Sequence, residues 1–238
     1  MSGAEETTGE VTDPTTTAGR ELDGGVGSYL RVVWAVARKD FILELRSKQA
    51  LPLSVALSLL IVVAFAFSFG GARNAQGALW VAFIFAGTLG VMQSISVETQ
   101  NSALDGMLLV PIPRSAIYLG KVISSTVFVT VIGVITLGAI SLFLHAAPAV
   151  DALPTLLLLI FLFSLGFSAV AVIVSIIATF TSISALLLPV LLVPLVVPAL
   201  LAGVELMTTW QSSWVTVLLS YDGIMLTAGL LVFGELVQ

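Results

Sequence analysis

Three ionisable side chains stand out because they lie within or beside long apolar stretches: His145, Glu205 and Asp222. Ionisable groups inside a membrane segment are costly and commonly functional. We predict Glu205 near the outer end of its apolar segment and Asp222 in the first turns of the next one. Both positions favour a structural role at the outer interface over a functional one. A proton-driven carrier needs such groups deeper in the bilayer, and the sequence indicates none there.

The sequence offers little for catalysis or metal binding. It contains no cysteine and one histidine, which excludes thiolate zinc sites, iron–sulfur clusters and disulfides. A phosphate-binding G-x-x-x-x-G-K-[ST] loop is absent, because Val122 follows Gly120-Lys121 and Ser115 replaces the first glycine. We predict that the chain is no enzyme and holds no cofactor or metal, with ATP hydrolysis left to a separate subunit. A haem or metal role for His145 is the less favoured alternative to an incidental one.

The polar segment 98–114 is the best candidate for contact with a partner. Its apolar residues recur at helical spacing, and prolines then end the helix: Ala103, Leu104, Met107, Leu108, Pro111 and Pro113. Such an apolar face can dock into a groove of a partner protein. It can equally pack against the chain's own membrane domain, and the spacing favours neither.

Composition places these residues in a membrane protein. Of 238 residues, 58% are hydrophobic and 10% charged, against ~45–50% and ~25% in an average soluble domain. The formal net charge of −5 arises within residues 1–23, so no basic surface remains for nucleic acid. We predict a disordered acidic tail over residues 1–28 and a single membrane domain over residues 29–238.

Six nearly uncharged stretches reach the ~20 residues that a spanning helix needs. The predicted fold is all-α and polytopic, with spans at about 51–69, 75–97, 122–145, 153–178, 186–206 and 216–236. Lysine and arginine concentrate before the first span and around Arg114 and Lys121. The positive-inside rule therefore predicts that both termini are cytoplasmic.

Residues 29–48 are predicted to form an amphipathic helix ahead of the first span. Its apolar stripe recurs at a spacing of three and four: Leu30, Trp34, Ala37, Phe41 and Leu45. Its basic residues lie towards the other side: Arg31, Arg38, Lys39 and Arg46. Such a helix suits the membrane interface, with its cations near anionic headgroups. A cytosolic lead-in to the first span is a compatible alternative.

Two spans carry packing signals. A stripe of small residues predicts a close helix–helix contact, with a substrate groove as the alternative: Ala78, Ala82, Ala86, Gly90 and Ser94. Three prolines predict a kinked or broken fifth span: Pro189, Pro194 and Pro198. The kink is either structural or part of a moving element.

Four stretches resemble the CcmB family, the membrane subunit of the haem-exporter ABC system in cytochrome c maturation. They are ARKDFILELRSKQ (37–49), LWVAFIFAGTLGVMQSISVETQNSALDGMLLVPIPRSAIYLGK (79–121), LLLPVLLVPLVVPALLAG (186–203) and LLSYDGIMLTAGLLVFGELV (218–237). The second is the most specific, and the likeness covers nearly everything after the tail. Two features depart from the family: the loop 179–184 lacks a basic residue that many relatives carry, and the acidic tail is an addition.

The resemblance implies an ABC-2-like permease of the plasma (inner) membrane, with residues 29–48 as its interfacial elbow helix. Two copies would work with an ATPase dimer, other haem-handling membrane proteins, a periplasmic haem chaperone and membrane lipid. By likeness, the segment 98–114 would be the ATPase-coupling loop, and the residues expected to matter are Glu98, Leu104, Asp105, Gly106, Met107, Pro111 and Arg114.

Three functions remain in competition. The first is an ABC permease subunit for haem export, or for ATP-driven release of haem or of a loaded chaperone held by partners. The second is an ABC-2 permease for another substrate, such as a drug, a lipid or a polysaccharide. The third is a membrane assembly scaffold that transports nothing. Because haem iron is usually held by His, Cys, Met or Tyr, a chain with one histidine favours release over direct haem passage.

Overall fold

The computed structural model describes residues 26–47, 50–69, 75–100, 113–180, 187–208 and 211–236. Within these residues the chain forms seven α-helices, one 3-10 turn and no strand, which confirms the prediction of an all-α fold. The elements are α2 (Val26–Ser47), α3 (Ala50–Phe69), α4 (Ala75–Gln100), α6 (Arg114–Phe143), η2 (Val150–Ala152), α7 (Leu153–Phe180), α8 (Leu187–Thr208) and α9 (Ser212–Leu236). The predicted tail at residues 1–25 and the segment 101–112 lie outside the described residues.

Six helices are long and apolar enough to cross a membrane, as predicted: α3, α4, α6, α7, α8 and α9. A helix rises 1.5 Å per residue, so the 20 residues of α3 match the ~30 Å thickness of a hydrocarbon core. Lipid offers no hydrogen bonds to a backbone, and a helix satisfies its own backbone groups internally. The apolar lengths therefore give a multi-pass membrane protein.

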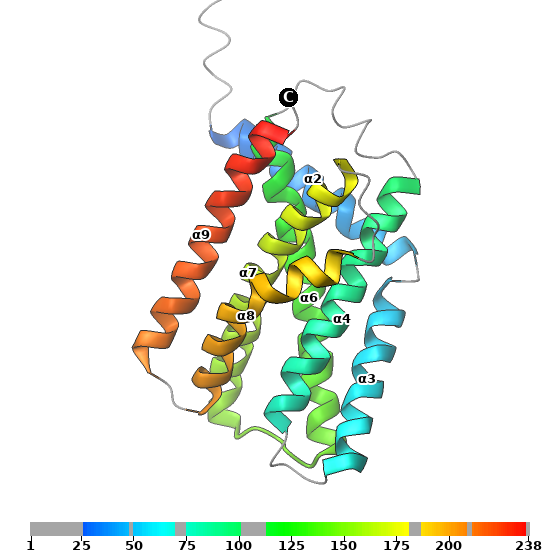
Figure 1. The fold of residues 1–238 in the computed structure, drawn as a ribbon, viewed down its shortest axis with the longest axis vertical. Coiled ribbons are helices and arrows are strands. Elements are labelled where there is room, and N and C mark those ends of the chain that lie inside the picture. The colour runs from blue at the N-terminus through cyan, green and yellow to red at the C-terminus, as the bar shows by residue number, and fades with distance from the viewer. Residues whose placement is uncertain are drawn as a thin grey trace, which may run out of the picture.

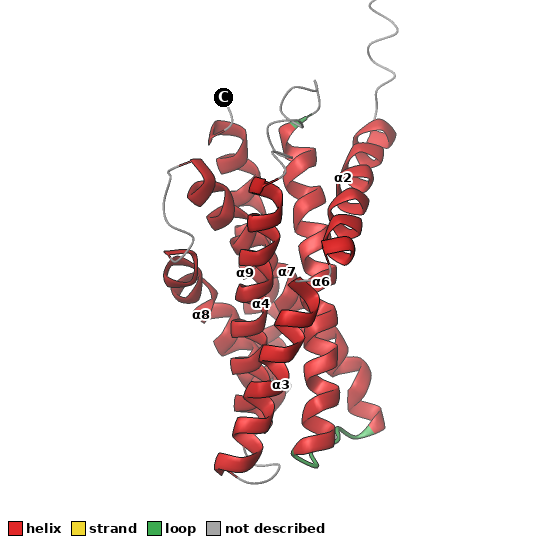
Figure 2. Cartoon of the chain, turned by 90° about the vertical axis from the view of Figure 1, so that its right-hand side faces the viewer, coloured by secondary structure: helices red, strands yellow, loops and turns green. Residues whose placement is uncertain are grey.

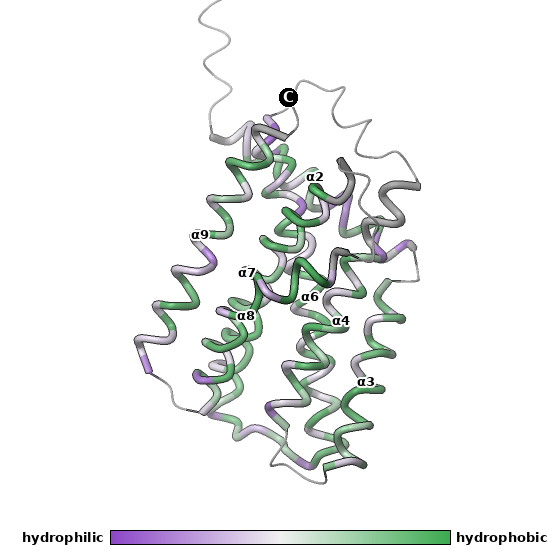
Figure 3. Tube along the Cα trace, viewed as in Figure 1, coloured by the Kyte–Doolittle hydropathy of each residue, from purple (hydrophilic) through white to green (hydrophobic). Residues whose placement is uncertain are grey.

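The six spanning helices run side by side, and α2 lies at one end of their bundle (Figures 1 and 2). Helices α6 and α7 are central: α6 contacts α2, α3, α4, α7 and α9. In the spanning window of α7, 67% of residues are buried, against 22% in α3 and α9. Figure 3 shows hydrophobic residues along most of each spanning helix. The outer helices thus present apolar side chains to lipid, and α7 fills the interior.

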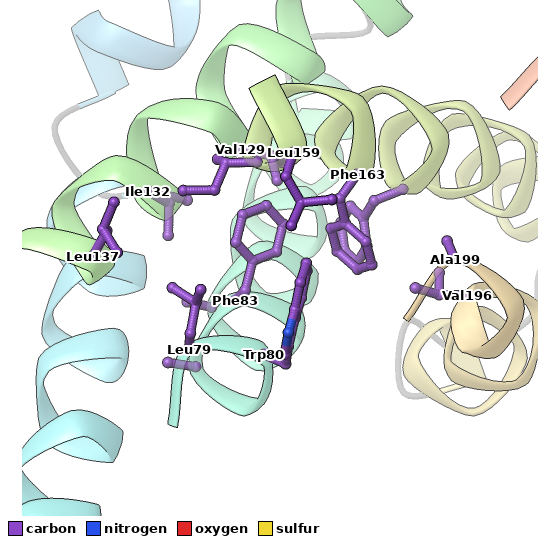
Figure 4. Packing of buried hydrophobic residues seen from close by; sticks show 14 of the residues in the cluster. Leu79, Trp80, Phe83, Val129, Ile132, Leu137, Leu159, Phe163, Val196 and Ala199 are labelled. Atoms are coloured by element: carbon purple, nitrogen blue, oxygen red, sulfur yellow. The ribbon is translucent and has the colours of Figure 1, made fainter. Parts of the chain in front are cut away.

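Aromatic rings from α4 and α7 form the centre of the hydrophobic core (Figure 4). The Phe163 ring meets Trp80 at a centroid distance of 4.7 Å and Phe83 at 4.9 Å, both edge-on. Such pairs contribute about 0.5–1.5 kcal/mol beyond the area they bury. A Cβ atom on Gly203 of α8 would lie 2.5 Å from the Trp80 ring, so this glycine lets α8 reach the cluster.

Three helices start at least three residues before their predicted starts. Helix α2 begins at Val26, so residues 26–28 belong to a helix and not to the predicted tail. Helix α9 begins at Ser212, four residues before the predicted span. Helix α6 begins at Arg114, eight residues before its predicted span. A hydropathy window excludes the charged first turns of α6, but α2 packs over those turns and supports them.

Helix α8 changes direction along its length (Figures 1 and 2). Its first part crosses the bundle, and its second part runs along it. Pro194 and Pro198 lie within this helix, and Pro189 lies in its first turn. Each internal proline lacks the backbone N–H for the carbonyl four residues earlier, and its ring crowds that carbonyl. The helix that bends is therefore the one that contains two prolines, which weaken its backbone hydrogen bonding.

Candidate functional site

Helices α7 and α9 approach closely at Gly166 of α7. A Cβ atom added at this glycine would overlap Oδ1 of Asp222 and would lie 2.8 Å from Cε1 of Tyr221. Small residues let membrane helices approach to backbone contact. Gly166 therefore leaves the space that the Asp222 carboxyl group and the Tyr221 ring occupy.

Asp222 is buried at this contact, with 3% of its surface exposed. Among the described residues, no hydrogen-bond donor reaches either of its carboxyl oxygens. Burying a polar group without a hydrogen bond is unfavourable, and burying a charge without a partner is far more so. Asp222 is thus the side chain in the described chain whose environment is least explained by packing alone.

The sequence analysis predicts Asp222 in the first turns of the last span, at the outer interface, whereas in the structure it lies nearer the middle of α9. Asp222 follows Ser212 by ten residues in a helix of 25, which is about 15 Å along the helix axis. The earlier start of α9 adds four residues to this distance, and α9 packs against the middle of α7 at Gly166. An acidic group does lie deep in the bundle, contrary to the sequence analysis.

Tyr221 connects the same place to the bend in α8. Its hydroxyl donates a hydrogen bond of 2.9 Å to the carbonyl oxygen of Leu195. Leu195 follows Pro194, whose carbonyl lacks its usual donor because Pro198 has no N–H. The hydrogen bond from Tyr221 thus reaches the carbonyl next to this gap, and neighbouring helices commonly stabilise the backbone around a proline in a membrane helix. Tyr221 and Asp222 together therefore join α9 to both α7 and α8.

Tyr118 of α6 forms a second junction, one that the sequence analysis did not single out. Its hydroxyl lies 3.4 Å from the carbonyl oxygen of Ala169 on α7 and 3.5 Å from that of Met225 on α9. A Cβ atom on Gly229 would overlap this hydroxyl. In the sequence, the only signals for this junction are a tyrosine and a glycine within apolar spans. They do not indicate which helices the tyrosine contacts.

The face of α2 that packs on α6 differs from the predicted apolar stripe, of which it includes Ala37 but not Leu30 or Trp34. Val33, Val36 and Ala37 are buried, whereas Leu30 is 57% exposed and Trp34 67% exposed. A Cβ atom on Gly120 of α6 would lie 2.7 Å from Val36. The gap at Gly120 therefore selects the valine face for packing and leaves the Leu30–Trp34 stripe on the surface, beside the exposed Arg31 and Arg38.

Charged residues also cross the contact between α2 and α6. The carboxyl group of Asp40 lies 2.8 Å from the ammonium of Lys39 and 3.7 Å from that of Lys121. Lys121 is nearly buried, and so is Glu44. Nearby, the Tyr29 hydroxyl donates a 3.1 Å hydrogen bond to the Ser115 hydroxyl. Both acids of α2 thus lie on or near the packed face, while its arginines remain on the surface.

Most of the proposed coupling residues cannot be placed. Leu104, Asp105, Gly106, Met107 and Pro111 lie outside the described residues, and Glu98 is described only as part of the α4 backbone. Arg114 begins α6 and is exposed. The structure therefore locates the two ends of this segment, at the end of α4 and the start of α6, on the same end of the bundle as α2 (Figure 1).

The remaining predicted residues have simple environments. The small residues of α4 lie inside the core, where Gly90 faces Phe128; they are Ala78, Ala82, Ala86 and Gly90, while the Ser94 side chain is not described. Glu205 is exposed, three residues before the end of α8. His145 is exposed in the connection after α6, with a left-handed φ of 53°. Among the described residues, no three His, Asp or Glu side chains gather as metal ligands.

The chain matches a protein-family model and is similar to a known protein. The family model described as "CcmB protein" matches residues 31–234. Heme exporter protein B of Rhodobacter capsulatus is 29% identical over 181 residues, which cover 72% of this chain and 80% of that protein. The matched range begins in α2 and ends in α9, so it includes Asp222, Gly166 and the contact between α2 and α6.

Proposed function

Since the chain belongs to the CcmB family, we propose that it is the membrane permease subunit of an ABC complex that serves haem export in cytochrome c maturation. The name of its relative, a heme exporter protein, supports haem as the cargo. In this proposal the chain itself hydrolyses no ATP, and a separate ATPase dimer supplies the motion. Haem is substrate or partner-held cargo, with no cofactor bound by this chain.

One observation carries the proposal. The segment 101–112 leads directly into α6, and α6 contacts five other helices: α2, α3, α4, α7 and α9. A force applied to this segment reaches the rest of the bundle through α6. Two turns into α6, Lys121 faces Asp40 of α2, so the motion of α6 also reaches α2. This arrangement supports 98–114 as the ATPase-coupling loop.

The surface of α2 supports a location at the cytoplasmic membrane interface. Leu30 and Trp34 are exposed next to Arg31 and Arg38, the combination that suits acyl chains below and anionic headgroups above. In this proposal α2 is the elbow helix, both termini are cytoplasmic, and the protein resides in the plasma (inner) membrane. Its partners are a second copy of the chain, haem-handling membrane proteins and a periplasmic haem chaperone.

The role assigned to this subunit is conversion of ATP-driven motion into release of haem, or of the loaded chaperone, held by partners. The chain has one histidine and no cysteine, which leaves few haem ligands. Haem binding by the purified subunit tests this role. Stoichiometric binding that depends on His145 and persists without partners contradicts it and supports direct passage of haem.

The coupling proposal is tested by replacing Leu104 and Met107 together with aspartate in the intact complex. We expect cytochrome c maturation in a deletion strain and transport-linked ATP turnover to be lost, because charge prevents docking of an apolar face. The matched control replaces Ala147 and Ala149 together with aspartate, which adds the same two negative charges to exposed residues in the connection after α6. We expect the control to retain both activities.

The outcomes separate the competing functions. Normal maturation and ATP turnover in the Leu104/Met107 variant contradict coupling and favour an assembly scaffold. Loss of ATP coupling without any maturation defect favours a permease for another substrate. Recovery of an ATPase and haem-handling proteins with the chain from membranes supports the haem complex, and their absence from the recovered complex opposes it.

A further inference from the structure

The carboxyl group of Asp222 is buried where the described residues offer no hydrogen-bond donor to stabilise its ionised form. It is 3% exposed, at about the middle of a spanning helix, and no donor reaches it among the described residues. An unpaired carboxylate in an apolar interior takes up a proton in preference to remaining charged. A second chain cannot reach the group in this arrangement, because the monomer itself covers it.

The helices packed against α9 provide no counter-charge beside Asp222. Helix α7 contains no Asp, Glu, His, Lys, Arg or Tyr, and α8 contains only Glu205, which is exposed. The ionisable residues of α6 are Arg114, Tyr118 and Lys121. Of these, Arg114 is exposed at the helix start, Tyr118 faces Gly229, and Lys121 faces Asp40.

Helix α9 itself adds two further ionisable residues. The Tyr221 hydroxyl donates its hydrogen bond to the Leu195 carbonyl of α8. Glu235 lies at the opposite end of α9 from Ser212, and its side chain is not described. Lys121 lies three residues after Tyr118, whose own contacts on α9 are Met225 and Gly229. Among the described residues, the Asp222 carboxyl group therefore faces Gly166 and the Tyr221 ring.

We propose that Asp222 is a proton-binding site, occupied when α7 and α9 are packed at Gly166 and vacated when these helices separate. In the packed form the proton is on the carboxyl group, which is then neutral. When separation admits water, the proton passes to water, and the carboxylate is solvated. The neighbouring Tyr221 holds the bend of α8, so protonation of Asp222 and the position of α8 depend on the same contact.

This inference is independent of the cargo, because it concerns the subunit alone and needs neither ATP nor haem. The full chain is reconstituted in lipid nanodiscs, with ¹³C label on the carboxyl groups of aspartate. Infrared spectroscopy then detects the carbonyl stretch of a protonated acid, which ionised carboxylates lack. We expect an isotope-shifted band at neutral pH that disappears at alkaline pH as the helices separate.

Three variants assign the band. Asp222→Asn removes the band. Asp222→Glu also removes the isotope-shifted band, because the new glutamate carries no ¹³C label. The matched control Asp151→Asn, at an exposed residue of η2, leaves it unchanged. Asn also mimics the neutral acid, so we expect the thermal stability of the Asn variant to lose the decline with rising pH that the unmodified protein shows.

Two results overturn the proposal. One is the absence of a protonated aspartate band at neutral pH, which is measured on the unmodified protein and needs no variant to fold. The other is a band that persists in both the Asn and the Glu variants, which assigns the proton to another aspartate. Failure of haem transport by any variant has no bearing on either result.

Discussion

The hydroxyl of Tyr221 on α9 donates a 2.9 Å hydrogen bond to the carbonyl oxygen of Leu195 on α8. Leu195 lies between Pro194 and Pro198, where the backbone ladder of α8 is weakest. The bend of α8 is therefore anchored by a residue of the neighbouring helix, and the adjacent residue of that helix is the buried Asp222. Packing at Gly166, the carboxyl group and the bend form one local unit.

Replacement of Tyr221 with phenylalanine should lower the free energy of unfolding by about 0.5–1.5 kcal/mol, the net contribution of one hydrogen bond. The ring remains, so packing against Gly166 is preserved. Unfolding of the purified protein in mixed micelles measures the change. Thr227→Val is the control, because Thr227 is exposed and bonds only within its own helix. An equal loss in both variants contradicts a specific anchoring role.

Gly166→Ala should destabilise the protein by about 1–3 kcal/mol, because the new methyl group meets Asp222 and Tyr221. Gly223→Ala, one residue after Asp222, has no atom within 4 Å of the added carbon. It should stabilise by up to about 1 kcal/mol, the usual preference for alanine over glycine in a helix. The same unfolding measurement compares the two. Opposite signs support the close contact, and tolerance of alanine at Gly166 contradicts it.

Asp40 and Lys121 should show energetic coupling of about 0.5–3 kcal/mol in a double-mutant cycle. The single variants are Asp40→Asn and Lys121→Gln, and the measured quantity is the free energy of unfolding. Coupling is expected because the two charged groups lie 3.7 Å apart across a nearly buried helix contact. Arg38→Gln combined with Lys121→Gln is the control cycle, since Arg38 is exposed. Additivity in the Asp40 cycle indicates that packing alone holds α2 on α6.

Replacement of Arg31 and Arg38 with glutamine should weaken the binding of anionic phospholipid by about 30-fold. Each cation at a membrane surface contributes about 1 kcal/mol of binding free energy, and two are removed. Displacement of a fluorescent phosphatidylglycerol from the detergent-solubilised protein measures this affinity. The double lysine variant retains the charge and should retain binding. If glutamine leaves the affinity unchanged, the exposed face of α2 is not the lipid-binding surface.

The sequence predicted the helical elements well because the signal for a spanning helix is local. Leu51 to Phe69 and the other apolar stretches fix helix type and approximate length without reference to neighbours. The start of α6 at Arg114 was missed, because its first two turns depend on cover from α2. The coupling residues Leu104 to Pro111 remain a prediction from spacing and family likeness.

The side-chain environments could not be predicted in this way. The sequence gives α2 two apolar faces, and the one that contains Val36 is buried because Gly120 of α6 leaves room for it. Asp222 was assigned to an interface by its distance from the start of an apolar run. Its actual environment depends on a glycine 56 residues earlier in the chain, on a different helix.

The six spanning helices follow from the amino-acid sequence alone, because the length and apolar composition of a segment are enough to predict a helix that satisfies its own backbone in lipid. Three features are visible only in the packed helices: the burial of Asp222 beside Gly166, the hydrogen bond from Tyr221 to α8, and the face of α2 that is buried. These contacts join residues far apart in the chain. At Gly166 and Gly120, the absence of a side chain on one helix leaves room for a larger residue of another.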